Sequence, residues 1–179
     1  MKCFILLLVL ISTISATIIE MSFDDGSFES QELSDSNNGY AQAFNMPGDY
    51  QLHSAKVYLT APSPRLTVKV RNYLTSSSIE LIGIGTLNDP VSGWNEVDLS
   101  AITLPTPIPG RLLVEAYDSG GVGIDNTYPW YSYYWVPYDQ PGVTLIHMLI
   151  NDIGIRLLIE VGPSAAESRT LGELKAIYH

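Results

Sequence analysis

Cysteine is nearly absent from the sequence: among its 179 residues, only Cys3 carries a thiol. Cys3 precedes the apolar run 4–11, whereas the cysteine of a lipoprotein would follow such a run, so we assign Cys3 to a removable leader. The mature chain then has no disulfide framework, no thiolate metal site and no thiol nucleophile. Its stability must come from packing.

Basic residues are also scarce, with 9 Lys and Arg against 19 Asp and Glu and a formal net charge of -10. Proteins that bind nucleic acid need basic side chains to neutralise phosphates. The charge balance therefore argues against a nucleic-acid partner and suits a soluble secreted protein. It leaves room for a divalent cation, because calcium prefers carboxylate and carbonyl oxygens.

The first residues have the layout of a secretory signal peptide. One positive charge at Lys2 is followed by the apolar run 4–11 and then by small polar residues up to Ala16. The apolar run is too short to cross a bilayer core of about 30 Å as a helix. We expect residues 1–16 to be a signal peptide cut after Ala16. The mature chain should be secreted or held at the cell surface, without an integral membrane span.

Two further parts follow the leader. Residues 17–161 are expected to form one domain, since a chain of 19.7 kDa is large enough for one core and short for two. Residues 162–179 form a C-terminal tail that opens with the linker-like stretch 163–166. Apolar residues from Leu171 to Tyr178 then recur at helical spacing, which fits either a short helix or a frayed terminus.

Between 18 and 161 the sequence has no amphipathic helical pattern; short stretches alternate apolar and polar residues and end in turn signals. This spacing predicts an all-β fold, a two-sheet antiparallel β-sandwich of roughly eight to ten strands in a jelly-roll-like arrangement. The stretch 143–150 also fits a helical turn, but its β-branched residues favour a strand. The expected strands lie at 19–23, 40–44, 52–61, 66–71, 79–86, 93–99, 110–118, 128–135, 143–150 and 154–161, and 27–38 is expected to be a surface loop.

Alternation also predicts which residues face the core. In the stretches 55–59 and 93–99 the apolar side chains, with Asn95, recur at every second position and should share the buried face. Gly83 and Gly85 lie inside a predicted strand and indicate a bulge or the close approach of another backbone. The three prolines of 105–109 cannot donate ladder hydrogen bonds, so that run is a loop.

The densest aromatic segment, 128–135, follows glycines at 120, 121 and 123 that allow a sharp turn. One interpretation is structural: the strand buries one aromatic face in the core. The other is a carbohydrate platform, in which rings pack against sugars while carboxylates and amides hydrogen-bond to hydroxyls. We assign ligand binding to nine residues of this region: Asp125, Asn126, Tyr128, Trp130, Tyr131, Tyr133, Trp135, Tyr138 and Asp139.

Aspartates at predicted turns are the candidates for a calcium site, namely Asp24, Asp25 and Asp118. Turn carboxylates and carbonyls are the usual calcium ligands, although this spacing is not that of an EF-hand. The same aspartates are also explained as turn formers. Apart from calcium, we expect no cofactor.

Catalytic motifs are missing as well, since the sequence has no G-x-S-x-G, H-E-x-x-H or P-loop pattern. His53, His147 and His179 are scattered, which is typical of core or surface histidines rather than of a general base. We therefore expect that the protein is not an enzyme. The alternative is a glycoside hydrolase or lyase that uses two carboxylates, such as Glu96 and Glu115. A third class is a structural component of an envelope or extracellular assembly.

Three segments together resemble a known class of module: Phe23-Asp24-Asp25-Gly26, the run GWNEVDL at 93–99, and Ile155-Arg156. They are similar to secreted bacterial and archaeal β-sandwich modules that occur alone or appended to extracellular hydrolases and surface proteins. The resemblance covers about 18–161. It implies a β-sandwich with a binding or adhesive role.

The tail at 171–178 also resembles short C-terminal tails on secreted proteins of some uncultured bacteria. That resemblance implies an export or docking signal. Taken together, the sequence predicts a non-catalytic secreted binding or adhesion module. Its expected partner is a glycan or another cell-surface polymer.

Overall fold

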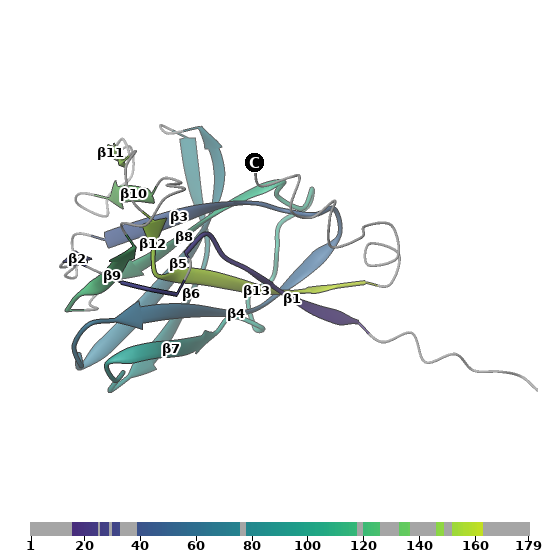
Figure 1. Cartoon of the computed structure of the whole chain (residues 1–179). Coiled ribbons are helices and arrows are strands. Elements are labelled where there is room, and N and C mark those ends of the chain that lie inside the picture. Colours follow the sequence, from purple (N-terminus) through teal and green to yellow (C-terminus); the bar gives the residue numbers. More distant parts are fainter. Residues whose placement is uncertain are drawn as a thin grey trace, which may run out of the picture.

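The computed structural model describes residues 16–24, 26–28, 30–32, 39–75, 78–117, 120–125, 133–136, 146–148 and 152–162. Within these ranges the chain forms thirteen strands and no helix (Figure 1). The predicted leader up to residue 15 and the predicted tail from residue 163 lie outside the described residues.

The strands follow one another closely along the chain. They are β1 (Thr17–Met21), β2 (Ser30–Glu32), β3 (Gly39–Asn45), β4 (Tyr50–Leu59), β5 (Arg65–Thr75), β6 (Ser78–Asn88), β7 (Gly93–Asp98), β8 (Arg111–Tyr117), β9 (Val122–Asp125), β10 (Tyr133–Val136), β11 (Ile146–Met148), β12 (Asp152–Ile153) and β13 (Ile155–Val161).

Antiparallel pairing joins these strands into two sheets. The seven-stranded sheet has the order β1-β13-β4-β9-β12, with β2 paired to β9 and β7 paired to β4. The six-stranded sheet has the order β11-β10-β3-β8-β5-β6. This arrangement confirms the predicted all-β sandwich of two antiparallel sheets, while its jelly-roll character stays a prediction.

The strand count exceeds the expected range because three very short strands carry too little alternation to be seen in the sequence. β2 lies inside the stretch 27–38, so the prediction of a loop is wrong at 30–32, where β2 pairs with β9. β9 itself lies in the glycine stretch that predicted only a turn. β12 has two residues and pairs with β9 as well. In each case the pairing partner is distant in the sequence, so no local pattern predicts the strand.

The core lies between the two sheets and follows the predicted alternation. From the seven-stranded sheet, Ala55, Val57 and Leu59 are all fully buried. Val68 and Val70 enter the same core cluster from the six-stranded sheet. The predicted core face of 93–99 is confirmed too, with Asn95, Val97 and Leu99 buried. Burial of this kind contributes about 25 cal/mol for each Å² of apolar surface removed from water.

Gly83 and Gly85 serve both purposes that the sequence indicated. A β-carbon on Gly85 would lie 2.8 Å from the backbone oxygen of Asp98 in β7, so only glycine permits this approach of β6 to β7. The register between β5 and β6 shifts beside Gly83, which marks a β-bulge. These contacts hold the edge of one sheet against the other.

The outer face of the six-stranded sheet carries a second buried cluster, made of Ala41, Ala43, Tyr73, Leu113 and Tyr117. Glu115 is fully buried on the same face. Its Oε2 accepts hydrogen bonds from Nε of Arg71 at 2.9 Å and from the Tyr117 hydroxyl at 3.1 Å. Pairing of this kind offsets the cost of burying a carboxylate.

Within the described ranges, no helix has the length and apolar character needed to span a bilayer.

Candidate functional site

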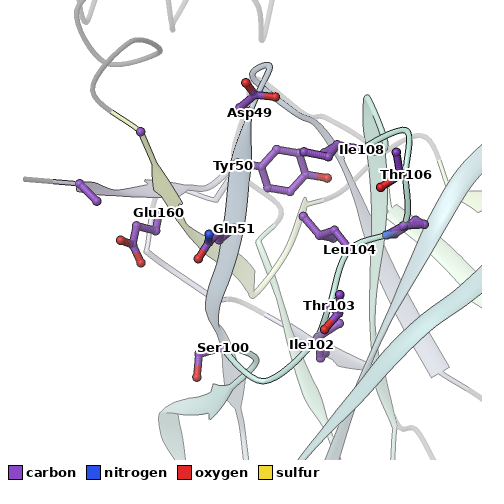
Figure 2. A pocket seen from close by; sticks show the side chains of 13 residues that line it. Asp49, Tyr50, Gln51, Ser100, Ile102, Thr103, Leu104, Thr106, Ile108 and Glu160 are labelled. Carbon is purple, nitrogen blue, oxygen red and sulfur yellow. The ribbon is translucent and has the colours of Figure 1, made fainter.

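A groove of about 650 Å³ lies between the loop 99–110 and the facing ends of β4 and β13 (Figure 2). Its walls come from four separate parts of the chain. The lining residues are Ala16, Asp49, Tyr50, Gln51, Ser100, Ile102, Thr103, Leu104, Pro105, Thr106, Ile108, Glu160 and Gly162.

The loop that forms one wall is anchored at its start by hydrogen bonds around the end of β7. The amide of Leu99 donates to the backbone oxygen of His53 at 3.0 Å, and the amide of Ile102 donates to Leu99 at 3.0 Å. The amide of Ser100 donates to Oδ1 of Asp98 at 2.8 Å, and this bond lowers the pKa of the Asp98 carboxyl. The Ser100 side of the groove is therefore fixed to the sheet.

The other end of the loop is held by Tyr50. Its hydroxyl donates to the backbone oxygen of Pro109 at 2.9 Å, and its ring lies between β4 and the loop in Figure 2. Burial raises the pKa of the Tyr50 phenol above its usual range, so the hydroxyl stays protonated and remains a donor. The amide of Met46 also donates to the backbone oxygen of Gly110 at 2.9 Å. The groove is thus held in place before any ligand arrives.

The groove combines an apolar wall with polar groups at its edges. Ile102, Leu104 and Ile108 supply the apolar surface, and Ile102 also packs against the core. Hydroxyl, amide and carboxylate groups from the other lining residues surround this surface. Sites for sugars need apolar area for the faces of the rings and hydrogen-bonding groups for their hydroxyls.

The carboxylates of the groove come from the ends of two paired strands. Asp49 and Gln51 flank the buried Tyr50 and are exposed, as the strand period requires. Gln51 is the register partner of Glu160 on β13, and the two side chains lie side by side in Figure 2. The lining includes no Lys, Arg or His.

The three segments behind the family resemblance meet elsewhere, on the outer face of the seven-stranded sheet. Arg156 donates from Nη2 to Asp24 Oδ1 at 2.6 Å and from Nε to Asp24 Oδ2 at 3.1 Å. It also donates from Nη1 to Glu20 at 2.8 Å, and its guanidinium lies 4.2 Å from the ring centre of Trp94. The hydrogen bonds to Asp24 raise the pKa of Arg156 above its usual value. We call Glu20, Asp24, Trp94 and Arg156 the arginine clamp.

Phe28 and Tyr58 extend the arginine clamp with an aromatic cluster. Their rings stack with centres 4.1 Å apart, and both meet Trp94 edge-on at 5.5 Å. Gly123 and Gly154 lie beneath them, where a β-carbon would come within 3 Å of these rings. The cluster therefore fixes the N-terminal segment on the sheet and has a structural role.

The structure describes only part of the predicted aromatic site. Asp125 lies on β9 with its side chain buried, opposite the buried Asp152 of β12. Tyr133 and Trp135 lie on β10, which pairs with β3 and β11, so part of the predicted aromatic strand is indeed a strand. Asn126, Tyr128, Trp130, Tyr131, Tyr138 and Asp139 lie outside the described residues. The assignment of ligand binding to this segment stays a prediction.

The calcium candidates are likewise described only in part. Both carboxylate oxygens of Asp24 accept hydrogen bonds from Arg156, so Asp24 is engaged by a cation already present in the chain. Asp25 and Asp118 lie outside the described residues. Among the residues that are described, no group of three or more His, Cys, Asp or Glu is placed to hold a metal ion.

The carboxylates considered for a glycosidase do not share a site. Glu96 faces outward on β7 in the seven-stranded sheet, where its Oε1 accepts a hydrogen bond from Ser54 at 2.5 Å. Glu115 lies on the opposite outer face, behind the six-stranded sheet. Packed sheets are about 10 Å apart, and both side chains point away from the core between them. A separation of that kind exceeds the roughly 5–9.5 Å that glycosidases use, so this pair cannot flank one bond.

No family model matches the sequence, and no curated protein matches it. Among solved structures, the fold is similar to that of the Clostridial cysteine protease Cwp84 after propeptide cleavage, with a TM-score of 0.58 and 11% identity. That match covers 80% of this chain and 40% of the other.

A second similar structure holds the cysteine protease and lectin-like domains of Cwp84, a surface-layer-associated protein of Clostridium difficile. Here the TM-score is 0.53, the identity 13%, and the coverage 71% of this chain and 33% of that one. The chain thus spans well under half the length of the proteins it matches. At this identity, the similarity establishes the fold alone.

Proposed function

We propose that this protein is a non-catalytic, secreted or surface-attached binding module whose ligand is a carbohydrate. The observation that carries the proposal is the groove: an apolar wall of Ile102, Leu104 and Ile108 rimmed by hydroxyl, amide and carboxylate groups. Tyr50 and the backbone hydrogen bonds of the loop hold these groups in place. A preformed site loses little entropy on binding, which supports affinity for flexible, hydrated sugars.

The structural neighbours support the same class of function. One similar structure is described as containing a lectin-like domain of a surface-layer-associated protein. The part of that protein that this chain matches is about a third of its length, which is compatible with a single domain. A secreted or surface location agrees with the predicted signal peptide and with the acidic composition.

The aromatic segment remains the second candidate surface, so the test must separate it from the groove. Binding to arrayed polysaccharides and oligosaccharides should be measured first with the wild-type protein. The double variant Gln51→Ala/Thr103→Ala removes two exposed groove groups and should weaken binding about tenfold, because each hydrogen bond contributes about 0.5–1.5 kcal/mol. Thr86→Ala, an exposed threonine on β6, is the matched control and should leave affinity unchanged.

Variants of the aromatic segment complete the comparison. Trp130→Ala and Trp135→Ala should be measured by thermal melting as well as by affinity, since loss of a buried aromatic costs about 3–5 kcal/mol and would remove binding by unfolding. If only these variants lose ligand while melting like the parent, the site is the aromatic segment and not the groove. If no glycan binds the wild-type protein, the proposed function is wrong.

One observation favours the enzyme alternative, a glycoside hydrolase or lyase: Asp49 and Glu160 line the same groove. Such an enzyme would release reducing ends from a polysaccharide that it binds, and a reducing-sugar assay on every positive glycan distinguishes the two functions. Release that is lost in both Asp49→Asn and Glu160→Gln would overturn the non-catalytic assignment.

A structural role in an envelope or extracellular assembly is favoured by exposed apolar side chains on β6, where Leu81 and Ile84 are about half exposed. β6 is also the last strand of its sheet, and unpaired strand edges promote self-association. A protein with that role would form larger species in size-exclusion chromatography and would bind no soluble glycan.

A further inference from the structure

The charged side chains that line the groove have only one sign. Asp49 and Glu160 contribute carboxylates, and the thirteen lining residues include no Lys, Arg or His. The predicted cleavage after Ala16 would remove Ala16 from the lining and leave one terminal ammonium at Thr17, beside Val161, against these two carboxylates. The chain as a whole carries a formal charge of -10, so its net charge has the same sign as this local charge. A ligand in the groove therefore meets a negative potential.

These two carboxylates are also available, unlike others in the same sheet. Glu20 and Asp24 pair with Arg156, and Glu96 accepts a hydrogen bond from Ser54. Among the described residues, neither Asp49 nor Glu160 takes part in an ion pair. Their charge is not used to hold the fold together, so it can act on a ligand.

We infer that the groove selects its carbohydrate by charge, preferring sugars that carry a free amino group, accepting neutral ones and excluding uronic or sulfated ones. The inference rests on the proposed function and names the ligand class of that same site. A carboxylate accepts a hydrogen bond from a neutral hydroxyl, and it accepts a stronger, charge-assisted bond from an ammonium group. An anionic sugar would gain neither and would be repelled.

The size of the preference follows from the exposure of the groove. In a water-like dielectric without salt, an ammonium at about 5 Å from one carboxylate gains roughly fourfold in affinity, and about sixteenfold from two. Salt screens this attraction, since the Debye length falls from about 30 Å at 0.01 M to about 8 Å at 0.15 M ionic strength. The preference should therefore shrink as salt is added.

Isothermal titration calorimetry with four β-1,4-linked hexamers tests the inference: glucose, glucosamine, N-acetylglucosamine and mannuronate units. Glucose and glucosamine differ only at C2, where an ammonium replaces a hydroxyl in buffer whose pH lies below the pKa of the amino group. With the full chain at 0.02 M salt, we expect the glucosamine hexamer to bind about tenfold more tightly than the glucose hexamer, and the mannuronate hexamer not to bind. The N-acetyl form has the nitrogen without the charge and should bind like glucose.

Two variants assign the preference to the groove. Asp49→Asn with Glu160→Gln should bring the glucosamine and glucose hexamers within about twofold of each other, and most of the lost affinity should be that of the glucosamine hexamer. Glu80→Gln removes an exposed carboxylate on β6 and controls for attraction by the net charge of the chain. It should leave the preference unchanged.

The outcomes separate the inference from the proposed function. If neutral and amino hexamers bind equally, or if the preference survives in the double groove variant, charge selection is wrong and the binding function stands. If Glu80→Gln reduces the preference as much as the groove variant does, the attraction is general and the inference also fails. If none of the hexamers binds, both the proposed function and this inference are overturned.

Discussion

Removal of Arg156 should destabilise the fold more than removal of any other cation on the same face. We consider Arg156→Met, which keeps a side chain of similar length against Trp94 and removes the charge and the donors. The variant leaves the carboxylate of Asp24 without its partner, and the Asp24 side chain has no exposed surface. Water cannot replace the two hydrogen bonds that Asp24 accepts from Arg156.

The expected loss is about 3 kcal/mol in the free energy of unfolding. Breaking a buried ion pair by removing one partner costs about 3–5 kcal/mol. Arg156 keeps 21% of its side chain exposed, so the pair is partly solvated and the lower end of this range applies. The stacking on Trp94 adds roughly 0.5–1 kcal/mol, part of which the methionine retains. For a domain of this size, 3 kcal/mol corresponds to about 6–12 °C in Tm.

Urea unfolding followed by circular dichroism and tryptophan fluorescence measures this loss. The matched control is Lys56→Met, because Lys56 contacts Glu20 at 2.7 Å in a pair that is about a third exposed, and such pairs contribute under about 1 kcal/mol. Adding Asp24→Asn to Arg156→Met should restore at least about 1 kcal/mol by removing the uncompensated charge. The reasoning is refuted if Arg156→Met and Lys56→Met cost the same, or if Asp24→Asn makes the variant worse.

Three further predictions follow from single contacts. Tyr50→Phe should lower the stability measured in thermal melts by about 1–3 kcal/mol, because the buried backbone oxygen of Pro109 loses its hydrogen-bond donor. The same variant should weaken glycan binding, because the groove loop is held less firmly. Unchanged melting would mean that the loop is held by its backbone hydrogen bonds alone. Gly85→Ala should lower the free energy of unfolding by about 1–3 kcal/mol in urea titrations, because the new β-carbon meets a backbone oxygen. Gly48→Ala, whose β-carbon would have nothing within 4 Å, should be neutral or slightly stabilising. Equal effects of the two variants would contradict the close approach at Gly85. Burial raises the pKa of Glu20, but hydrogen bonds from Lys56 and Arg156 outweigh burial and lower it, so Glu20 stabilises the fold above its ordinary pKa of 4.5 and loses this effect as the pH falls through the lower folded value. The difference in stability between wild type and Glu20→Gln should therefore shrink below pH 4.5. A constant difference would show that the hydrogen bonds do not favour the charged form.

The fold could be predicted from the sequence to the extent that single strands carry their own pattern. The alternation in 55–59 and 93–99 placed the buried side chains correctly, because a strand with one face in the core must repeat every second residue. Gly83 and Gly85 indicated a close approach for the same kind of local reason. The short strands β2, β9 and β12 could not be predicted, since their stability comes from partners far along the chain.

The groove could not be predicted either, because no single stretch of the sequence contains it. Its lining comes from Ala16 and from residues near 50, near 104 and near 160, and the pairing of β13 with β1 and with β4 brings three of these four parts together. The prolines of 105–109 predicted a loop and gave no sign of what the loop faces. A signal existed in the exposed polar residues on either side of Tyr50, but the same pattern is expected for any strand end at the surface.

The residues by which the sequence resembles secreted β-sandwich modules hold the fold and do not line the groove. Asp24, Trp94 and Arg156 form the arginine clamp, which ties the turn after β1 to the first residues of β13. Glu160 lies on the same strand, four residues after Arg156 and thus about 13 Å away, where the groove begins. A strand fixed at one end by a buried ion pair can present different side chains at its other end without loss of the fold. The arginine clamp thus stabilises the sandwich, while ligand binding depends on the loop and strand ends that the clamp does not touch.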